Sequence, residues 1–208
     1  MSRPLLCGLI LLAAGGSRRM GRAKQLLPVQ GQPLVRYVAK QALHASAIAP
    51  VVVVLGAEAE RIVPSLAGLA LKIAVNARWR EGQGESLRVG MAAALTEAPE
   101  LDAVIVALAD QPSLPPGHLD ALVATYRAGG CSIVASQVGA ERVPPVLFGA
   151  QHFPRLQTLA GDTGARTLVR EFASETAVVS LSTNIDLDTP EDYARFQANH
   201  APPPDECS

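Results

Sequence analysis

The chain has 208 residues, of which 49% are hydrophobic and only 4% are aromatic. That length suits one domain with a sizeable core, and Leu, Val, Ile and Ala must fill it. The chain has 18 Lys and Arg residues and 19 Asp and Glu residues, which gives a net charge of -1. This charge does not favour binding to nucleic acid or to an acidic membrane.

The cysteines and the N-terminal stretch bear on the compartment. Cys7, Cys131 and Cys207 are scattered and form no C-x-x-C pair, which argues against a disulfide framework or zinc site and predicts a reducing, cytoplasmic location. The opening MSRPLLCGLILLAAGG resembles a signal peptide but equally has the pattern of a buried strand. We favour the strand, because cleavage after Ala14 would separate it from the basic loop that follows. No run is long and apolar enough to span a membrane.

Strand and helix patterns alternate along the chain. The predicted strands are residues 5–12, 51–55, 71–75, 103–108, 132–136 and 177–181, with an extended segment at 143–148. The predicted helices are residues 34–45, 58–66, 85–98, 119–127 and 164–172, and a last one that begins at Pro190. Such repeats predict right-handed crossovers in a single three-layer, Rossmann-like α/β domain over residues 1–199, with a mostly parallel mixed sheet. Residues 200–208 are predicted to be a disordered tail.

The segment LLAAGGSRRMGRAKQLLP follows the first predicted strand. Its small residues let the backbone turn closely around a ligand and present N–H groups to an anion. Arg18, Arg19 and Lys24 add positive charge, which predicts a site for a triphosphate.

Two familiar phosphate loops do not fit this segment. A Walker A motif needs Lys directly after its second Gly, but Arg22 follows Gly21 here. The G-x-G-x-x-G dinucleotide fingerprint is missing, because Gly15 and Gly16 are adjacent. An ordinary flexible loop is the remaining alternative.

The pattern L-A-A-G-x-S-x-R-M-G-x-x-K-Q-L-L-P, from Leu12 to Pro28, resembles the signature of the MobA-like nucleotidyltransferases of molybdenum cofactor biosynthesis. The resemblance implies the GT-A-like fold of nucleotide-diphospho-sugar transferases. It also implies that Arg19 and Lys24 bind phosphates and help pyrophosphate leave. The Ala13–Ala14 pair resembles the cytidylyl-transferring members, whereas guanylyl-transferring members usually carry Gly-Gly. The expected nucleotide contacts are Leu12, Ala13, Ala14, Gly15, Gly16, Ser17, Arg19, Lys24, Gln83 and Ser86.

Two acidic segments are candidates for a metal site. Asp110 ends the predicted strand AVIVALAD, where its carboxylate would project into the ligand crevice. Mg²⁺ prefers such oxygen ligands. In NIDLDTPEDY, Asp186 and Asp188 alternate and would face one side of an extended segment, although Asp188 or Thr189 also suits a helix cap. We predict Asp110 and Asp186 as the Mg²⁺ ligands, with the choice between Asp186 and Asp188 left open.

Two further loops are expected to contact substrates. Gln83 and Ser86 stand where a helix begins, so they suit either a base and ribose contact or simple capping. The string G-D-x-G-A-R-x-L, from Gly161 to Leu168, resembles the cytidylyl-transferring subgroup, which makes Asp162 and Arg166 the predicted acceptor contacts. A structural arginine is the alternative. One departure from the family pattern, Arg142 to Pro145, puts the identity of the acceptor in doubt.

The resemblance implies Mg²⁺-dependent transfer of CMP from CTP to the terminal phosphate of molybdopterin, free or metal-loaded. Arg19, Lys24 and Asp110 are the expected catalytic residues, and a client molybdoenzyme is a further expected partner. GTP, or another phosphorylated acceptor, is the nearest rival. A non-catalytic cofactor chaperone and a dinucleotide-dependent oxidoreductase are rivals of other classes.

Overall fold

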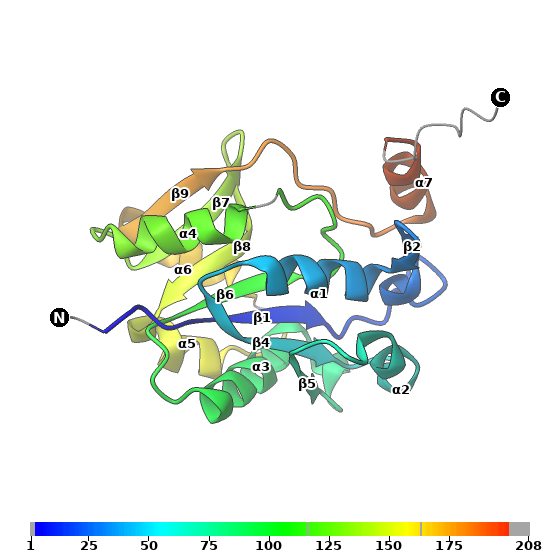
Figure 1. Ribbon diagram of the computed structural model, residues 1–208, viewed down its shortest axis with the longest axis horizontal. Coiled ribbons are helices and arrows are strands. Elements are labelled where there is room, and N and C mark those ends of the chain that lie inside the picture. The colour runs from blue at the N-terminus through cyan, green and yellow to red at the C-terminus, as the bar shows by residue number, and fades with distance from the viewer. Residues whose placement is uncertain (1–2, 116, 163, 200–208) are drawn as a thin grey trace.

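The computed structural model describes residues 3–115, 117–162 and 164–199. It confirms the predicted Rossmann-like α/β fold, in which helices cover both faces of a seven-stranded sheet (Figure 1). In spatial order the strands are β5 (Lys72–Val75), β4 (Ile48–Leu55), β1 (Cys7–Ala13), β6 (Ala103–Leu108), β8 (Glu141–Gly149), β7 (Ile133–Val138) and β9 (Thr176–Ser180). The tail predicted to be disordered lies outside the described residues.

The sheet is mixed, and its parallel half positions the cavity described below. Strands β5, β4, β1 and β6 run parallel to one another, whereas β8 is antiparallel to both β6 and β7. Leu12 lies in register with Val54 on one side and with Leu108 on the other. The carboxyl ends of β1, β4 and β6 therefore meet at one edge of the sheet, where ligands bind in open α/β sheets.

Alternation along the strands divides the core into two layers. Leu9 and Leu11 of β1 face one layer, and Ile10 and Leu12 face the other. The first layer is closed by α1 (Leu34–His44), α4 (His118–Arg127) and α7 (Pro190–Asn199), and the second by α3 (Gln83–Glu97), α5 (Phe153–Thr158) and α6 (Arg166–Glu171). Because both faces are covered, the inner strands are apolar almost throughout.

Some short elements differ from the prediction. The helix expected at 58–66 is a short α2 (Ala59–Ile62) followed by a 3₁₀ turn (Val63–Leu66), because Pro64 lacks the N–H that an α-helix needs. Helix α5 and the hairpin of β2 (Pro28–Val29) and β3 (Gln32–Pro33) were not predicted. Other 3₁₀ turns occupy Lys24–Leu26, Trp79–Glu81, Ala150–His152 and Ala173–Glu175.

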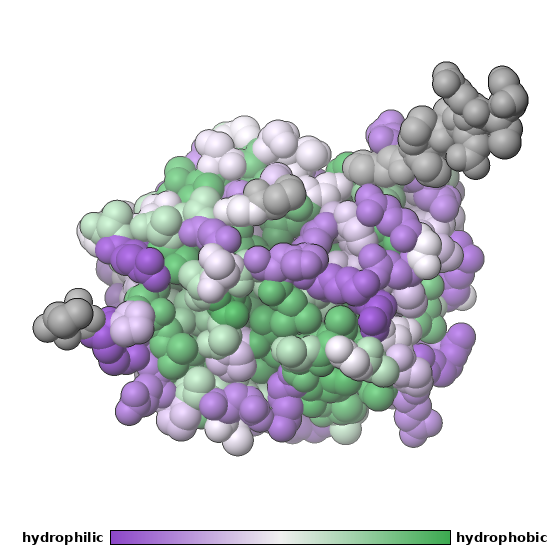
Figure 2. Space-filling model, in the orientation of Figure 1, coloured by the Kyte–Doolittle hydropathy of each residue, from purple (hydrophilic) through white to green (hydrophobic). Residues whose placement is uncertain are grey.

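Hydrophobic surface is modest. On the face in Figure 2, green atoms gather below the centre, where Figure 1 shows β4, β5 and α2. Among the described residues, the large hydrophobic side chains more than one third exposed are Val63, Val75 and Val178. Val75 and Val178 lie on β5 and β9, the two edges of the sheet. Within the ranges given above, no helix combines the length and apolar character needed to cross a membrane.

Helix α3 lies very close to the sheet at Gly90. A methyl group at Gly90 would come within 2.5 Å of Ile10 Cγ2 and 2.9 Å of Val54 Cγ2, both in buried strands. Glycine in a helix interior costs about 1 kcal/mol relative to alanine, so close packing rather than helix propensity explains its presence. This packing positions the start of α3 over the edge of the sheet.

Replacing Gly90 by Val should lower the free energy of unfolding by about 3 kcal/mol, because the added methyl groups overpack a rigid interface. Ala92→Val, at an exposed position of the same helix, is the matched control and should cost about 0.5 kcal/mol. Urea denaturation of both variants measures the difference. Equal losses of stability would show that α3 does not depend on this contact.

Candidate functional site

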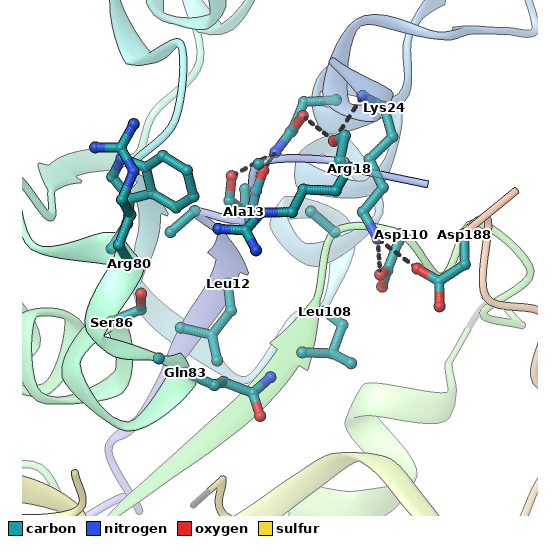
Figure 3. Close-up of a pocket in the computed structure, with 18 of the residues that line it drawn as sticks. Leu12, Ala13, Arg18, Lys24, Arg80, Gln83, Ser86, Leu108, Asp110 and Asp188 are labelled. Carbon is teal, nitrogen blue, oxygen red and sulfur yellow. Dashed lines mark hydrogen bonds and ion pairs between the residues drawn. The ribbon is translucent and has the colours of Figure 1, made fainter. Parts of the chain in front are cut away.

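A cavity of about 600 Å³ opens at the carboxyl ends of β1 and β6 (Figure 3). We call it the nucleotide cavity. Every residue predicted to contact the nucleotide lines it, as do Asp110 and Asp188. Its lining consists of Leu12, Ala13, Ala14, Gly15, Gly16, Ser17, Arg18, Arg19, Lys24, Gln25, Trp79, Arg80, Gly82, Gln83, Ser86, Leu108, Ala109, Asp110, Asp162 and Asp188.

The loop after β1 is held from inside by Gln25. Its side-chain amide donates hydrogen bonds to the carbonyl oxygens of Ala13 and Gly15, both at 2.8 Å. The Ser17 hydroxyl accepts a hydrogen bond from the Lys24 backbone N–H at 3.0 Å. With these carbonyls bonded inward, the loop has a defined shape around the cavity.

Lys24 and Asp110 meet across the cavity. Lys24 Nζ lies 2.5 Å from Asp110 Oδ2 and 2.9 Å from Asp188 Oδ1, and Figure 3 shows the lysine reaching toward both carboxylates. Arg19 contacts the other oxygen of Asp188 at 2.6 Å. The side chains of Lys24 and Asp110 are each only 16% exposed, so this is a largely buried ion-pair network.

Burial and charge shift the pKa values in opposite directions at this network. Burial acts to lower the pKa of Lys24, but Asp110 and Asp188 outweigh it and raise that pKa above its ordinary value. For Asp110, burial raises the pKa; Lys24 opposes the rise, while Asp186 and Asp188 add to it. The pKa of Asp188 is lowered, because Lys24 and Arg19 together outweigh its burial. Asp110 thus has one positive partner, Lys24, whereas Asp188 has two.

One carboxylate oxygen of Asp110 has the properties expected of a ligand for a cation. Its Oδ1 atom is buried and has no hydrogen-bond partner within the described part of the chain. A buried acceptor left unpaired is costly, and a divalent ion would satisfy it. The described residues contain no ready-made group of three or more His, Cys, Asp or Glu side chains arranged for a metal. Asp110 therefore fits a metal that takes few protein ligands and completes its shell with substrate and water, as Mg²⁺ does.

The two candidate second ligands have different surroundings. Leu187 N–H donates to the Asp110 carbonyl oxygen at 3.0 Å, which ties the segment 186–188 beside the end of β6. Both oxygens of Asp188 contact cations, whereas Asp186 Oδ1 accepts a hydrogen bond from the neutral Gln111 amide at 2.8 Å. Asp188 is not the cap of α7, because Thr189 and Asp192 form reciprocal capping bonds there.

The start of α3 forms the opposite wall. Ser86 is buried and accepts a hydrogen bond from the Asn76 amide at 3.0 Å, so its position is fixed by the core. Gly84 N–H donates to the Gly161 carbonyl oxygen at 2.9 Å, and a methyl group at Gly82 would collide with that same residue. Glycine at 82 and 84 thus lets residues 159–162 pack against the helix start, beside Gln83.

A second cavity of about 460 Å³ adjoins the first and contains the predicted acceptor residues. Asp162 lines both cavities, while Arg166 and Asp186 line only the second, which we call the acceptor cavity. Asp110 and Asp188 also line both cavities, so the acidic groups stand at their junction.

Sequence reasoning missed three polar or aromatic residues of the nucleotide cavity. Trp79 packs against the glycine loop, where a methyl group at Gly16 would lie 2.8 Å from its ring, and the Arg80 guanidinium lies 4.5 Å from the ring centroid. The third is Gln25, which holds the loop. The N-A-R-W-R string before Gly82 contains the only tryptophan of the chain, which was the available signal. Figure 3 also shows Arg18 extending toward the middle of the cavity.

Comparison with known proteins places these features in a family. The sequence profile of the MobA-like NTP transferase domain matches residues 9–177. The nicotine blue oxidoreductase of Paenarthrobacter nicotinovorans is 35% identical, over 90% of this chain and 94% of the relative. The purine catabolism protein PucB of Bacillus subtilis is also 35% identical, over 93% of this chain and 96% of the relative. The molybdenum cofactor guanylyltransferase of Rhodobacter capsulatus is 29% identical, over 90% and 93%.

Solved structures share the fold. The crystal structure of Rv0371c from Mycobacterium tuberculosis superposes with a TM-score of 0.79 at 25% identity, covering 93% of this chain and 98% of that one. Rv0371c has also been solved in complex with manganese. The chain belongs to the MobA-like NTP transferase family and has the Rossmann-like fold of the nucleotidyltransferases.

Proposed function

We propose that this nucleotidyltransferase moves CMP from CTP to the terminal phosphate of molybdopterin and acts in the cytoplasm, upstream of a molybdoenzyme that receives the product. The observation that carries the proposal is the shared nucleotide cavity. A rigid glycine loop with Arg18, Arg19 and Lys24 stands on one side of it, and Asp110 with an unpaired buried oxygen stands on the other. Polyphosphate and a divalent cation need that combination of charges.

The proposed reaction is a phosphoryl displacement without a covalent enzyme intermediate. A terminal phosphate oxygen of the acceptor attacks the α-phosphorus of CTP. A new P–O bond forms, the bond between the α-phosphorus and the bridging oxygen breaks, and pyrophosphate leaves with that electron pair. Lys24 and Arg19 line the cavity. In the proposed reaction they stabilise the departing charge, and the loop after β1 orients the triphosphate.

We assign Asp110 and Asp186 as the carboxylates that hold Mg²⁺. Asp110 Oδ1 lacks a partner, and Asp186 has no ion pair anywhere in the described residues, whereas Asp188 is already neutralised by two cations. When bound, Mg²⁺ supplies positive charge that reduces the repulsion between the two phosphorylated substrates. Asp188 in this arrangement positions Lys24 rather than the metal.

The choice of CTP rests on the loop. Ala13 and Ala14 are buried and line the cavity, where guanylyl-transferring relatives of the resembled family usually have glycine. Because one relative is a guanylyltransferase, GTP is the alternative nucleotide. Because another relative is an oxidoreductase, a redox role is the alternative of another class. A cofactor chaperone, the remaining alternative, would bind molybdopterin without turnover.

Asp110→Asn should lower the rate of pyrophosphate release by about 1,000-fold, since the amide keeps the shape but loses the charge for the metal. Asp120→Asn, on α4 and outside both cavities, is the matched control and should retain full activity. Thermal unfolding of both variants confirms folding. Full activity of Asp110→Asn would remove this carboxylate from the mechanism.

Nucleotide choice can be read directly from Trp79, the only tryptophan of the chain, because it lines the nucleotide cavity. CTP with Mg²⁺ should quench its fluorescence at least tenfold more tightly than GTP, a difference of about 1.4 kcal/mol. Pyrophosphate release with molybdopterin should follow the same order. Preference for GTP in both measurements would make the chain a guanylyltransferase. Oxidation of a nicotinamide cofactor without pyrophosphate release would favour the redox alternative.

Lys24→Met should bind Mn²⁺ about tenfold more tightly than the natural protein when no nucleotide is present, because the ammonium group repels a cation from Asp110, Asp186 and Asp188. The same variant should lose CTP affinity. Paramagnetic resonance of free Mn²⁺ measures the metal, and Lys72→Met, which removes an exposed ion pair with Glu97, is the control.

The same Mn²⁺ titration, with Lys24 present, distinguishes Asp186 from Asp188 as the second metal ligand. Asp186→Asn should weaken Mn²⁺ binding in the presence of CTP more than Asp188→Asn does. The reverse order would assign the metal to Asp188 and leave Asp186 with its Gln111 contact alone.

A further inference from the structure

A third hollow, of about 590 Å³, lies beyond the acceptor cavity and is lined by three arginines, Arg142, Arg166 and Arg170. We call it the basic cavity. It shares Val146, Arg166 and Arg170 with the acceptor cavity, so the two adjoin. The acceptor cavity therefore has the acidic group that includes Asp110 in its lining and this cluster of positive charge at its border.

The three arginines come from two elements that pack together. Arg142 lies on β8 and donates to the carbonyl oxygens of Val169, at 3.5 Å, and Ala173, at 3.3 Å, which holds it against α6. Arg166 and Arg170 are four residues apart on α6 and so lie on the same face of that helix.

The three arginines have no carboxylate partner in the described part of the chain. Within the described residues, none of Arg142, Arg166 and Arg170 forms an ion pair, although Glu141 also lines the basic cavity. Like charges gathered around one hollow repel one another, and guanidinium groups bind oxyanions well, often with two hydrogen bonds. An anion in the basic cavity would relieve that repulsion.

We propose that the basic cavity binds a second anionic group of the acceptor, a phosphate, carboxylate or similar oxyanion, remote from the phosphate that attacks the nucleotide. This proposal rests on the proposed nucleotidyl transfer, because that reaction is what places the acceptor in the acceptor cavity. An extended polyanion fits poorly, because four carboxylates line the acceptor cavity: Asp110, Asp162, Asp186 and Asp188. An acceptor with two separate anionic groups matches this distribution of charge.

Arginine modification by phenylglyoxal, mapped by mass spectrometry of peptides, tests the site without any substrate. Inorganic phosphate should slow modification of Arg142 and Arg170 about tenfold, since an oxyanion held by charged donors covers them. Arg127, exposed on α4, is the internal control and should react at an unchanged rate. Equal rates with and without phosphate at Arg142 and Arg170 would overturn the proposal.

Steady-state kinetics test the role in catalysis. Arg142→Gln and Arg170→Gln should each raise the KM for metal-loaded molybdopterin about tenfold, with kcat and the CTP affinity read from Trp79 unchanged. Arg170→Lys should restore part of the loss, and Arg127→Gln should change nothing. An unchanged KM in both glutamine variants would refute the acceptor contact.

The two proposals fail separately. If phosphate protects Arg142 and Arg170 but no triphosphate yields pyrophosphate, the anion site stands and the transferase proposal falls. If pyrophosphate forms normally while phosphate protects neither arginine, the transferase proposal stands and the basic cavity is not an anion site.

Discussion

The buried contact between Lys24 and Asp110 is the interaction on which the rest of the site depends. It joins a loop after β1 to the end of β6, across 86 residues of sequence, and both side chains are largely withdrawn from water. Charges in such a place are tolerated only as a pair, since removing one partner costs about 3–5 kcal/mol. The pair is possible because β1 and β6 are neighbours in register, so their carboxyl ends stop side by side. The fold thus fixes the position of both charges.

That contact also helps to give the nucleotide cavity a defined shape. Gln25 holds the loop carbonyls and Lys24 is anchored by two carboxylates, so little conformational freedom remains to be lost when a triphosphate binds. The cost is that Lys24 must share its charge between the protein and the phosphates. Its raised pKa keeps the ammonium group charged during that exchange, because the carboxylates outweigh burial. Binding of nucleotide and of metal should therefore assist each other, since each relieves a charge that the other leaves unbalanced.

Local patterns predicted the parallel half of the sheet well, and long-range contacts account for most of the differences. The apolar runs of β1, β4 and β6 have no polar face, which is typical of strands covered on both sides, and the glycine loop and Asp110 follow directly from them. Helix α5 is only six residues long and begins beside Pro154, so it carries almost no periodic signal. The place of Trp79 against Gly16 and the pairing of Lys24 with Asp188 depend on segments far apart in sequence. No local pattern contains them.

The nucleotide side and the acceptor side of the cleft come from different parts of the chain. The first is built by β1, its loop, β6 and the start of α3, whereas β8 and α6 supply the arginines of the second. Relatives of similar identity are named for different activities, which is what a constant triphosphate site joined to a variable acceptor site would produce. The departure from the family pattern at Arg142 falls in the basic cavity and adds a charge there. In our proposal, the residue that made the acceptor uncertain in the sequence is therefore also one that helps to define which acceptor binds.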